Sequence, residues 1–290
     1  MRVAYLSSED VIGPAAGRRT DAFEHDLMMA TLDGADPDVR FEAVQWDADA
    51  DWSAFDAVMI GTTWDYMRRR AAFLDRLGEI ARATPLYNSP QTVAWNIDKR
   101  YLADLSVRGA PVLPLRLADR ASPETAAEAM RAFDTDCLVI KPQIGAGGWR
   151  QALYAAGDPW PEADALPPGP AILQPFLPAI QTEGEYSLIY IDRTFSHALR
   201  KSPAQGDYRV QSSYGGREEV WVPDAEARAA AEACLAQVKD ELLYARVDLA
   251  RGREGRLELM ELEVIEPYLY PKQGPELGAR VTAALKRRLD

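Results

Sequence analysis

The first ninety residues of the chain alternate between short apolar segments and longer segments with helical spacing. Residues 1–8, 41–46 and 55–63 are short and rich in strand-forming side chains, whereas residues 15–34 and 67–83 have the spacing of helices. This alternation predicts a mostly parallel sheet covered by helices, which is a three-layer α/β unit. No glycine-rich dinucleotide fingerprint follows the first strand, so a NAD-dependent enzyme is a weak alternative for this unit.

The rest of the chain has an α+β pattern. Residues 92–109 read as one helix that ends at Gly109. The predicted strands and helices that follow are strands at 112–117, 137–142, 150–155 and 171–177, a helix near 123–133, a hairpin of 186–191 and 195–201 that turns at Asp192–Arg193, a helix at 224–243, strands at 245–250 and 256–265, and a helix at 275–289. The predicted fold class is therefore α/β plus α+β.

Composition excludes several kinds of partner. The formal charge of −12 argues against a broad nucleic-acid surface, and no apolar segment approaches the length of a membrane span. The N-terminus lacks a secretory pattern, so we expect a cytoplasmic protein without nucleic-acid or membrane partners. Cys137 and Cys234 are predicted to be buried hydrophobic residues, and neither His25 nor His197 has metal-ligand spacing.

The segment at 256–267, RLELMELEVIEP, is a strongly acidic strand. Regular alternation would place Leu257, Leu259, Glu261 and Glu263 on one face. The other face would then carry Glu258, Met260, Leu262 and Val264. Two carboxylates so close together on one face are unfavourable unless a positive charge lies between them.

A third carboxylate comes from the preceding strand. If residues 253–256 form a four-residue loop, Asp248 lies directly opposite Glu261 and on the same face as Glu263. Such a patch of oxygen ligands suits Mg²⁺. The alternative is a solvated face on which the glutamates pair with Arg246 or Arg256.

The segment CLVIKPQIGAGGWR combines an apolar strand, a lysine at its end and a glycine-rich loop. Gly145, Gly147 and Gly148 would let backbone N–H groups approach phosphate oxygens, and Lys141 would add a point charge. The glycine spacing matches neither a Walker loop nor a dinucleotide fingerprint. Taken alone, a hairpin turn with a solvent-exposed lysine is the commoner explanation of this segment.

The order of these motifs is similar to that of a known family. NIDKRYL carries Lys99, VIKP carries Lys141, and these precede AILQPFLPAI, TEGEYSL, SHALRKSP, RVQSSYGG and ELEVIEP. The series resembles the ATP-grasp superfamily and looks closest to its glutathione-synthetase-like branch. The segments TTWDYMRRRAAFL, NIDKRYL and ELEVIEPYLY resemble the subgroup that includes the D-cycloserine pathway cyclo-ligase. The resemblance extends from Val3 to Leu285.

The resemblance implies an ATP-grasp fold, in which a Rossmann-like pre-ATP-grasp domain (1–95) precedes two α+β lobes (96–173 and 174–290) that clasp ATP. It implies an ATP-dependent carboxylate–amine ligase that forms an acyl phosphate from a small amino-acid-like or peptide-like substrate. The alternatives are an ATP-binding regulatory or inactive protein, and an intramolecular cyclo-ligase. Small-molecule carboxylate and amine substrates are the implied partners, and a homodimer is the family-level expectation.

The same resemblance implies a role for each matching residue. The phosphates of ATP would be held by Lys99, Lys141 and the loop with Gly145, Gly147 and Gly148. The adenine would contact Gln174, Phe176 and Leu177, and the ribose would contact Glu185 or Glu183. Two Mg²⁺ ions, with Mn²⁺ as an alternative metal, would bind Asp248, Glu261 and Glu263. Arg209 would stabilise phosphoryl transfer with help from Arg200 or Lys201, while Gly215 and Gly216 would approach the acyl oxygen. Glu263 is a departure, because this branch often has asparagine there.

Further residues are candidates for the substrate side. Residues 64–66 follow a strand end at the carboxyl edge of the first sheet, where open α/β sheets bind ligands. Residues 68–70 are three arginines, one of which would bind a substrate carboxylate. Glu266, Tyr268 and Tyr270 follow the acidic strand and are candidates to line the acceptor pocket. Packing at a domain seam and a solvated helix start are the plain alternatives for these residues.

Overall fold

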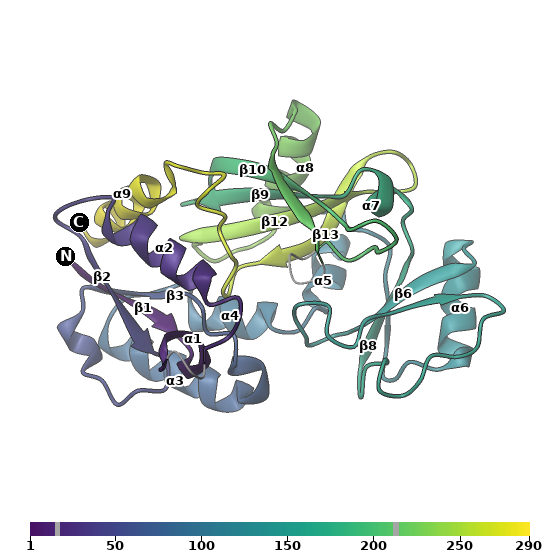
Figure 1. Cartoon of the computed structure of the whole chain (residues 1–290), viewed down its shortest axis with the longest axis horizontal. Helices are drawn as coiled ribbons and strands as arrows, with labels where there is room; N and C mark the ends of the chain where they lie inside the picture. Colours follow the sequence, from purple (N-terminus) through teal and green to yellow (C-terminus); the bar gives the residue numbers. More distant parts are fainter. Residues whose placement is uncertain (15–17, 211–214) are drawn as a thin grey trace.

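Three β-sheets organise the chain, whose computed structural model describes residues 1–14, 18–210 and 215–290 (Figure 1). The first sheet is parallel with the strand order β2-β1-β3-β4. Its strands are β1 (Arg2–Ser7), β2 (Arg40–Gln45), β3 (Ala57–Ile60) and β4 (Leu86–Tyr87). In the described ranges, no helix is long and apolar enough to cross a membrane.

Helices cover both faces of the first sheet, as the alternating pattern predicted. Helix α2 (Phe23–Asp33) packs through Met28 against Val3, while α3 (Arg70–Ala83) packs through Phe73 against Leu6 on the other face. The shorter elements are α1 (Glu9–Ile12) and two 3₁₀ turns, η2 (Trp52–Ala54) and η3 (Tyr66–Arg68). Helix α2 begins at Phe23, not at the predicted residue 15, and residues 15–17 lie outside the described residues.

The second sheet is antiparallel, in the order β5-β8-β6-β7, and is covered by one helix. Its elements are β5 (Arg116–Ala118), β6 (Cys137–Pro142), β7 (Ala152–Ala155), β8 (Ala171–Pro175) and α6 (Pro123–Phe133). The strand predicted at 112–117 is mostly absent, because Pro111 and Pro114 have no N–H to donate to a ladder. Cys137 is half-buried at the start of β6, so its predicted burial is only partly correct, whereas Cys234 is fully buried.

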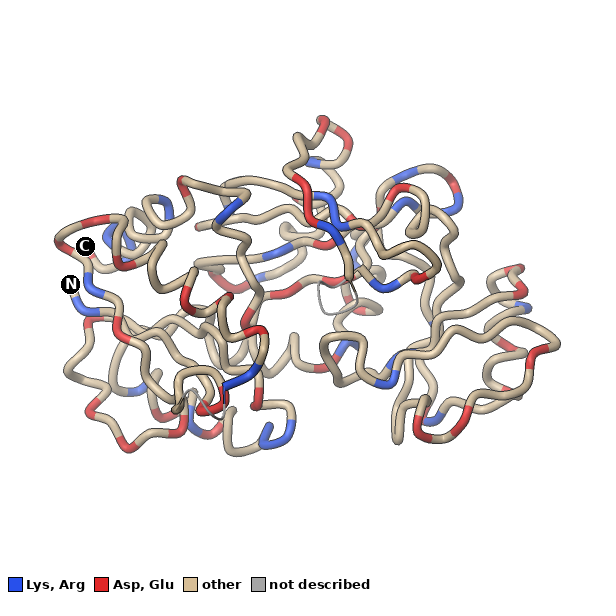
Figure 2. The backbone as a smooth tube through the Cα atoms, in the orientation of Figure 1, with Lys and Arg blue, Asp and Glu red and all other residues tan. Residues whose placement is uncertain are grey.

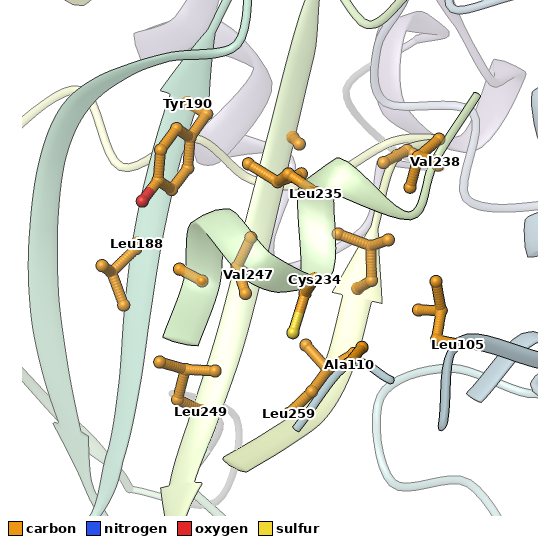
Figure 3. Close-up of a cluster of buried hydrophobic side chains, with 14 of the residues drawn as sticks. Leu105, Ala110, Leu188, Tyr190, Cys234, Leu235, Val238, Val247, Leu249 and Leu259 are labelled. Atoms are coloured by element: carbon orange, nitrogen blue, oxygen red, sulfur yellow. The ribbon is translucent and has the colours of Figure 1, made fainter. Parts of the chain in front are cut away.

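The third sheet is antiparallel, in the order β11-β10-β9-β12-β13. Its elements are β9 (Glu185–Ile191), β10 (Thr194–Ser202), β11 (Arg217–Val220), β12 (Tyr244–Arg251) and β13 (Leu257–Glu263), with α7 (Ala179–Thr182) and α8 (Ala225–Ala236) beside it. The predicted hairpin turn is confirmed, since Asp192 and Arg193 have φ of 51° and 57°. Figure 3 shows Cys234 of α8 among Ala110, Val247 and Leu259 in the core under this sheet.

Helix α8 ends at Ala236, seven residues before its predicted end. Arg193, in the turn between β9 and β10, donates hydrogen bonds to the carbonyl oxygens of Leu235, Val238 and Asp240. The carbonyl oxygen of Leu235 also accepts from the N–H of Val238, and Arg193 adds a side-chain donor at the end of the helix, where carbonyl groups lack intrahelical partners. A tertiary contact therefore ends the helix where local propensity would have extended it.

The C-terminal helix α9 (Leu277–Leu289) returns to the first sheet and lies beside α2 (Figure 1). Gly278 allows this close approach, because a Cβ there would lie 2.2 Å from the carbonyl oxygen of Thr31. Lys286 pairs with Asp36, and Arg288 pairs with Asp192. The first and third sheets therefore share one hydrophobic core.

Two further helices, α4 (Pro90–Asn96) and α5 (Tyr101–Val107), connect the first unit to the others. The predicted boundary between residues 95 and 96 falls within α4, and that between 173 and 174 falls within β8.

Asn88 joins the first unit to the third sheet. Its side-chain amide donates to the carbonyl oxygens of Tyr244 and Val264 at 2.9 and 2.8 Å, and its oxygen accepts from the N–H of Leu243 at 2.8 Å. We expect Asn88→Ala to lower the free energy of unfolding by about 3 kcal/mol or more, because three buried backbone groups lose their partner. Denaturant unfolding would measure this loss.

The matched control is the neighbouring Ser89→Ala, which removes an N-cap bond to the N–H of Thr92 and should cost about 1 kcal/mol. A loss for Asn88→Ala no larger than that for Ser89→Ala would contradict the assignment.

Candidate active site

A cleft of ≈ 1070 Å³ lies between the three sheets. Its walls include Trp64 from the first unit, Lys141 from the second sheet and Glu261 from the third. The cleft is where residues far apart in the sequence meet.

The hairpin of β12 and β13 places the acidic residues. Asp248 lies opposite Glu261, as predicted, but not through the predicted four-residue loop. Arg251 pairs with Leu257, so the loop has five residues, 252–256, and the register then shifts by one between Leu249 and Asp248. A β-bulge at Met260 restores the predicted pairing.

The bulge also corrects the predicted faces of this strand. Leu257 and Leu259 are buried in the same core as Leu262 and Val264, not on the face of Glu261 and Glu263. One extra residue reverses the alternation, so Met260 turns toward the cleft with the two glutamates. The core-facing side chains of the strand are therefore apolar on both sides of the bulge, while Glu261 and Glu263 face the cleft.

Strand β13 is at the edge of its sheet, and side chains satisfy its free backbone groups. Asn96 donates to the carbonyl oxygen of Leu262 at 2.9 Å, and the hydroxyl of Tyr101 accepts from the N–H of Leu262 at 2.9 Å. These contacts from α4 and α5 protect the edge from other partners and hold Glu261 and Glu263 in position.

The three carboxylates are paired with cations. Asp248 accepts from Arg246 at 3.0 Å and from Ser187, and Glu261 lies 3.0 Å from Lys99. Glu263 also accepts from Arg246. Figure 2 shows acidic and basic positions close together on these central strands. In the described part of the chain, no three carboxylate, histidine or cysteine side chains are arranged around a common metal position.

The pKa values of the three carboxylates are shifted in different directions. Burial acts to raise the pKa of both Asp248 and Glu261, but Arg246 and Lys99 respectively outweigh it, so that both pKa values are lowered. Burial raises the pKa of Glu263 to about 7 in spite of Arg246. The oxygen donors fit Mg²⁺ in kind, and the two cations now neutralise the charge that a metal ion would otherwise balance.

Lys99 lies in a break between two helices, not inside the single helix predicted at 92–109. The side chain of Asp98 accepts from the N–H of Arg100 at 3.0 Å, a local bond that competes with helix formation. The break lets the N–H of Lys99 donate to the carbonyl oxygen of Gln143 at 2.9 Å. Its ammonium group donates to the carbonyl oxygen of Gly145, so Lys99 joins the glycine loop to Glu261.

Lys141 is 8% exposed and lines the cleft from the end of β6. Among the described residues, its ammonium group has no hydrogen bond and no ion pair within 4.0 Å. Burial lowers its pKa to about 8, and the charge of Lys99 acts in the same direction. A buried cation in this state is an incomplete site that an anion would complete.

The glycine loop follows Lys141 along the same wall. Gly147 and Gly148 have φ of 61° and 71°, which side chains rarely adopt. Gly145 is needed for space, because a Cβ there would lie 2.6 Å from Pro142. Trp149, at the end of the loop, is 52% exposed.

The predicted adenine contacts lie together at another part of the cleft. Gln174, Phe176 and Leu177 all line it, from the end of β8 onward. The side-chain amide nitrogen of Gln174 is buried and has no hydrogen-bond partner among the described residues. Buried donors in folded proteins are nearly always satisfied, so this amide marks a place for an acceptor.

Of the two residues predicted as alternative ribose contacts, one lies on the cleft wall and the other does not. Glu185 is buried, lines the cleft and pairs with Lys201. Burial by itself would lower the pKa of Lys201, but Asp248 and Glu185 outweigh it and raise that pKa. Glu183 is not part of the cleft wall and instead pairs with Arg251 at 2.6 Å.

The predicted catalytic residues are only partly brought together. Arg209 and Lys201 line the cleft, and Arg209 is held by Asp207 at 2.8 Å. Arg200 is one position along β10 from Lys201, so it points away and pairs with Glu219. Gly215 and Gly216 are not among the residues of the cleft wall, and residues 211–214 of their motif lie outside the described residues.

Arg246, predicted from the sequence only as an ion-pair partner of the glutamates, also lies on the cleft wall. It is 7% exposed, lines the cleft and bridges Asp248 and Glu263. The sequence could have predicted this position, because residues two apart on a strand share a face and Arg246 precedes Asp248 by two.

The first unit contributes the remaining wall. Trp64, Tyr66, Arg68 and Arg70 line the cleft, as do Glu266, Tyr268 and Tyr270 from the segment after β13. Burial and the charge of Glu263 raise the pKa of Glu266 to about 8. Asp65 and Arg69 are not part of this wall, because Asp65 accepts a hydrogen bond from Trp46 at 2.7 Å and Arg69 pairs with Asp47 at 2.7 Å. Most, but not all, of the candidates for the substrate side therefore lie on the cleft.

Comparisons with known proteins agree with this geometry. The family described as the N-terminal domain of D-cycloserine synthetase DcsG matches residues 3–88. The chain is 31% identical over 269 residues to the cycloserine biosynthesis protein DcsG of Streptomyces lavendulae, covering 87% of this chain and 89% of that protein.

Solved structures are similar over nearly the whole chain. The crystal structure of D-cycloserine synthetase DcsG matches with a TM-score of 0.82 and 26% identity, over the full length of both chains. D-alanine–D-alanine ligase from Bacillus anthracis matches with a TM-score of 0.69 and 14% identity, over 100% and 97% of the two chains. The ATP-grasp ligase PsnB, complexed with its minimal precursor, matches with a TM-score of 0.65 and 18% identity, over 98% of each.

Proposed function

Since the chain belongs to the ATP-grasp superfamily, near the DcsG subgroup, and is an ATP-dependent ligase, we propose that it activates a small carboxylate as an acyl phosphate and joins it to an amine. The observation that carries this proposal is the state of Lys141, a buried cation beside a glycine loop, with no ion-pair partner within 4.0 Å in the part of the chain that the structure describes. Opposite it stands a set of carboxylates that cations neutralise. Together they form a place for a polyanion and its metal.

The proposed nucleotide position uses the residues that line the cleft. Lys99 and Lys141 hold the phosphates from two sides, and the loop at Gly145, Gly147 and Gly148 closes over the terminal phosphate. Gln174, Phe176 and Leu177 hold the adenine, and the amide of Gln174, which has no partner within residues 1–14, 18–210 and 215–290, supports the assignment. Glu185 contacts the ribose in preference to Glu183, which is engaged elsewhere.

The proposed metal ligands are Asp248, Glu261 and Glu263, with Mg²⁺ as the metal and Mn²⁺ as an alternative. When bound, the metal would neutralise charge on the phosphates. Lys99 would then release Glu261 and Arg246 would release Glu263, so that both cations become available to the phosphoryl group. The cations therefore keep the carboxylates in position before the nucleotide arrives.

The proposed reaction needs little covalent chemistry from the protein. A substrate carboxylate oxygen bonds to the γ-phosphorus of ATP as the bond to the β-phosphate oxygen breaks, which releases ADP. The amine then bonds to the acyl carbon, and phosphate leaves with its oxygen while the amine loses a proton. Arg209, Arg246 and Lys201 stabilise the charge on the transferring group, and the glycine loop excludes water.

An isotope experiment tests the acyl phosphate. Amino acids and other small carboxylates are first screened for ADP release with Mg²⁺ and ATP, and an active carboxylate is then labelled with ¹⁸O. The proposal predicts that the released phosphate carries one ¹⁸O atom from that carboxylate. Phosphate without label would mean that water, not the carboxylate, attacks ATP.

Intramolecular ring closure is a second form of the same reaction, favoured by the likeness to a protein named as a D-cycloserine synthetase. The mass of the product distinguishes the two. Ring closure yields a product smaller than its substrate by one water molecule, whereas ligation yields the sum of two molecules less one water.

The pKa of Lys141 makes nucleotide binding dependent on pH. Bound phosphate favours the charged form, so the pKa of Lys141 is higher in the complex than its value of about 8 in the free protein. We expect the affinity for a non-hydrolysable ATP analogue to be constant from pH 7 to about 8 and to fall above it by up to about tenfold per pH unit. Calorimetric titration would measure this change.

Lys141→Arg is the control for this dependence, because a guanidinium stays charged throughout the range. Its affinity should be flat where that of the wild type falls. An equal slope in both proteins would assign the titration to another group.

A further inference from the structure

The two ends of the glycine loop are held by side chains with different surroundings. At the N-terminal end the ammonium group of Lys99 donates to the carbonyl oxygen of Gly145, and the same lysine pairs with Glu261. Both contacts belong to the proposed phosphate and metal positions, so nucleotide binding would exchange them. At the C-terminal end the loop is held by Arg150, whose hydrogen-bond acceptors lie outside those positions.

The side chain of Arg150 extends behind the loop and away from the cleft. Its neighbours Trp149 and Gln151 line the cleft, whereas Arg150 is not part of the cleft wall. The Nη1 atom of Arg150 donates to the carbonyl oxygens of Ala163 and Leu166 at 3.2 and 3.3 Å. The guanidinium group therefore ties the end of the glycine loop to a second segment of the same unit.

The segment at 163–166 is itself fixed by the core of the second sheet. Leu166 is 6% exposed and belongs to the same hydrophobic cluster as Leu138 of β6. Trp160, which precedes the segment, packs edge-on against Tyr154 of β7 at 4.8 Å between ring centroids. This cluster includes α6, so it lies on the side of the sheet that α6 covers. The anchor of the loop therefore does not depend on what the cleft binds.

The backbone of Arg150 is in the left-handed region, with φ of 50°. A Cβ atom makes this region unfavourable, and the loop uses glycine at Gly147 and Gly148, where φ is 61° and 71°. At residue 150 the chain keeps a large side chain in spite of this cost. Residues in such conformations persist where the surrounding contacts fix them, and they cluster at ligand clamps and switch regions. The two bonds of Arg150 to carbonyl oxygens are contacts that a glycine could not make.

The same guanidinium group also restrains the last side chain of the loop. Trp149 lines the cleft and is 52% exposed, and the guanidinium carbon of Arg150 lies 5.3 Å from the centroid of its ring. A cation at this distance is attracted to the face of an aromatic ring. Arg150 therefore holds both the backbone and the aromatic side chain at the end of the loop.

We infer that Arg150 is a positioning residue for the terminal phosphate of the nucleotide, because it fixes one end of the glycine loop while Lys99 exchanges its contact at the other end. The loop then closes over the phosphate by moving about a fixed end. A loop that is anchored in this way loses less conformational freedom when it closes, so a triphosphate binds more tightly. This inference rests on the proposed function.

Two measurements on the protein test this role. Calorimetric titration with Mg²⁺ gives the dissociation constants of ADP and of the β,γ-imido analogue of ATP. Hydrogen exchange followed by mass spectrometry gives the protection of the peptide that covers the loop, and the peptide that covers β9 shows whether each protein is folded. The variants are Arg150→Ala and Arg150→Gly, and the matched control is Arg131→Ala, which changes an exposed arginine of α6 outside the cleft wall.

We expect both variants of Arg150 to bind the imido analogue about tenfold or more weakly than the wild type, because two charge-assisted hydrogen bonds that order the loop are lost. ADP has no terminal phosphate, so its dissociation constant should stay near the wild-type value. The loop peptide of both variants should exchange faster than that of the wild type, with the β9 peptide unchanged. Arg131→Ala should match the wild type in every measurement.

Three results would overturn this role of Arg150 and leave the nucleotide site standing. The first is wild-type affinity for the imido analogue in both folded variants. The second is a loss in Arg150→Ala alone, because glycine adopts the left-handed backbone freely and only backbone strain would then matter. The third is an equal loss of affinity for ADP and for the analogue, which would assign the effect to the whole unit. A wild-type protein that binds neither nucleotide would overturn the proposed function itself.

Discussion

Replacing Lys141 with alanine is expected to remove most of the stabilisation that a Mg²⁺-bound ATP analogue gives the native protein. A ligand at 100 times its dissociation constant adds about 2.7 kcal/mol to the free energy of unfolding. Loss of one charge-assisted bond to phosphate weakens binding by about 10- to 150-fold, so the same analogue concentration would add only about 0.3 to 1.4 kcal/mol. Thermal or denaturant unfolding with and without the analogue measures the difference.

The control is Lys239→Ala, which changes an exposed lysine outside the cleft. It should respond to the analogue as the wild type does. If Lys141→Ala kept the full stabilisation, the nucleotide would not lie against this lysine, and the proposed phosphate position would be wrong.

Replacing Glu261 with glutamine should lower Mg²⁺-dependent ADP release by at least about a hundredfold. The charge of Glu261 acts to raise the pKa of both Lys99 and Lys141, the two lysines of the proposed phosphate position. The neutral amide would remove one ligand of the proposed metal and the ion-pair partner of Lys99 at once. Initial rates of ADP release over a range of Mg²⁺ concentrations measure the effect.

Glu258→Gln is the matched control, because Glu258 lies on the same strand but outside the cleft wall. It should keep near-wild-type turnover. A Glu261→Gln protein that is folded and turns over ATP at the wild-type rate would sink the metal assignment.

The order of strands and helices could be predicted because it depends on local pattern. Apolar spacing identified the parallel unit, the hairpin at Asp192 and the acidic strand, and all are present. The limits of the helices could not be predicted in the same way, since individual side-chain hydrogen bonds, some distant and some local, set them. Arg193 ends α8, and the local bond of Asp98 breaks the helix before Tyr101.

The register of the acidic hairpin was predicted correctly for an incorrect reason. A five-residue loop and a bulge at Met260 offset each other, so Asp248 still pairs with Glu261 while Leu257 and Leu259 turn to the core. A bulge adds one residue to the strand, so an interpretation that assumes regular alternation assigns the wrong face to the residues on one side of it. The faces of such a strand therefore need the structure.

The set of cleft residues was partly accessible from motifs and partly not. The order of motifs predicted Lys99, Lys141 and the carboxylates as site residues. Only the pairing of β10 with β11 shows that Lys201 faces the cleft and Arg200 does not. Glu24 belongs to no motif of the nucleotide lobes. It reaches the cleft because the first unit and the third sheet share a core, which is a tertiary fact.

The most direct test of this account is ADP release by the wild-type protein with ATP, in four mixtures that include or omit Mg²⁺ and the amino acids. We predict that ADP forms only when both Mg²⁺ and an amino acid are present. ADP release that does not depend on an amino acid, or nucleotide binding without any release, would contradict the assignment of this cleft to carboxylate activation.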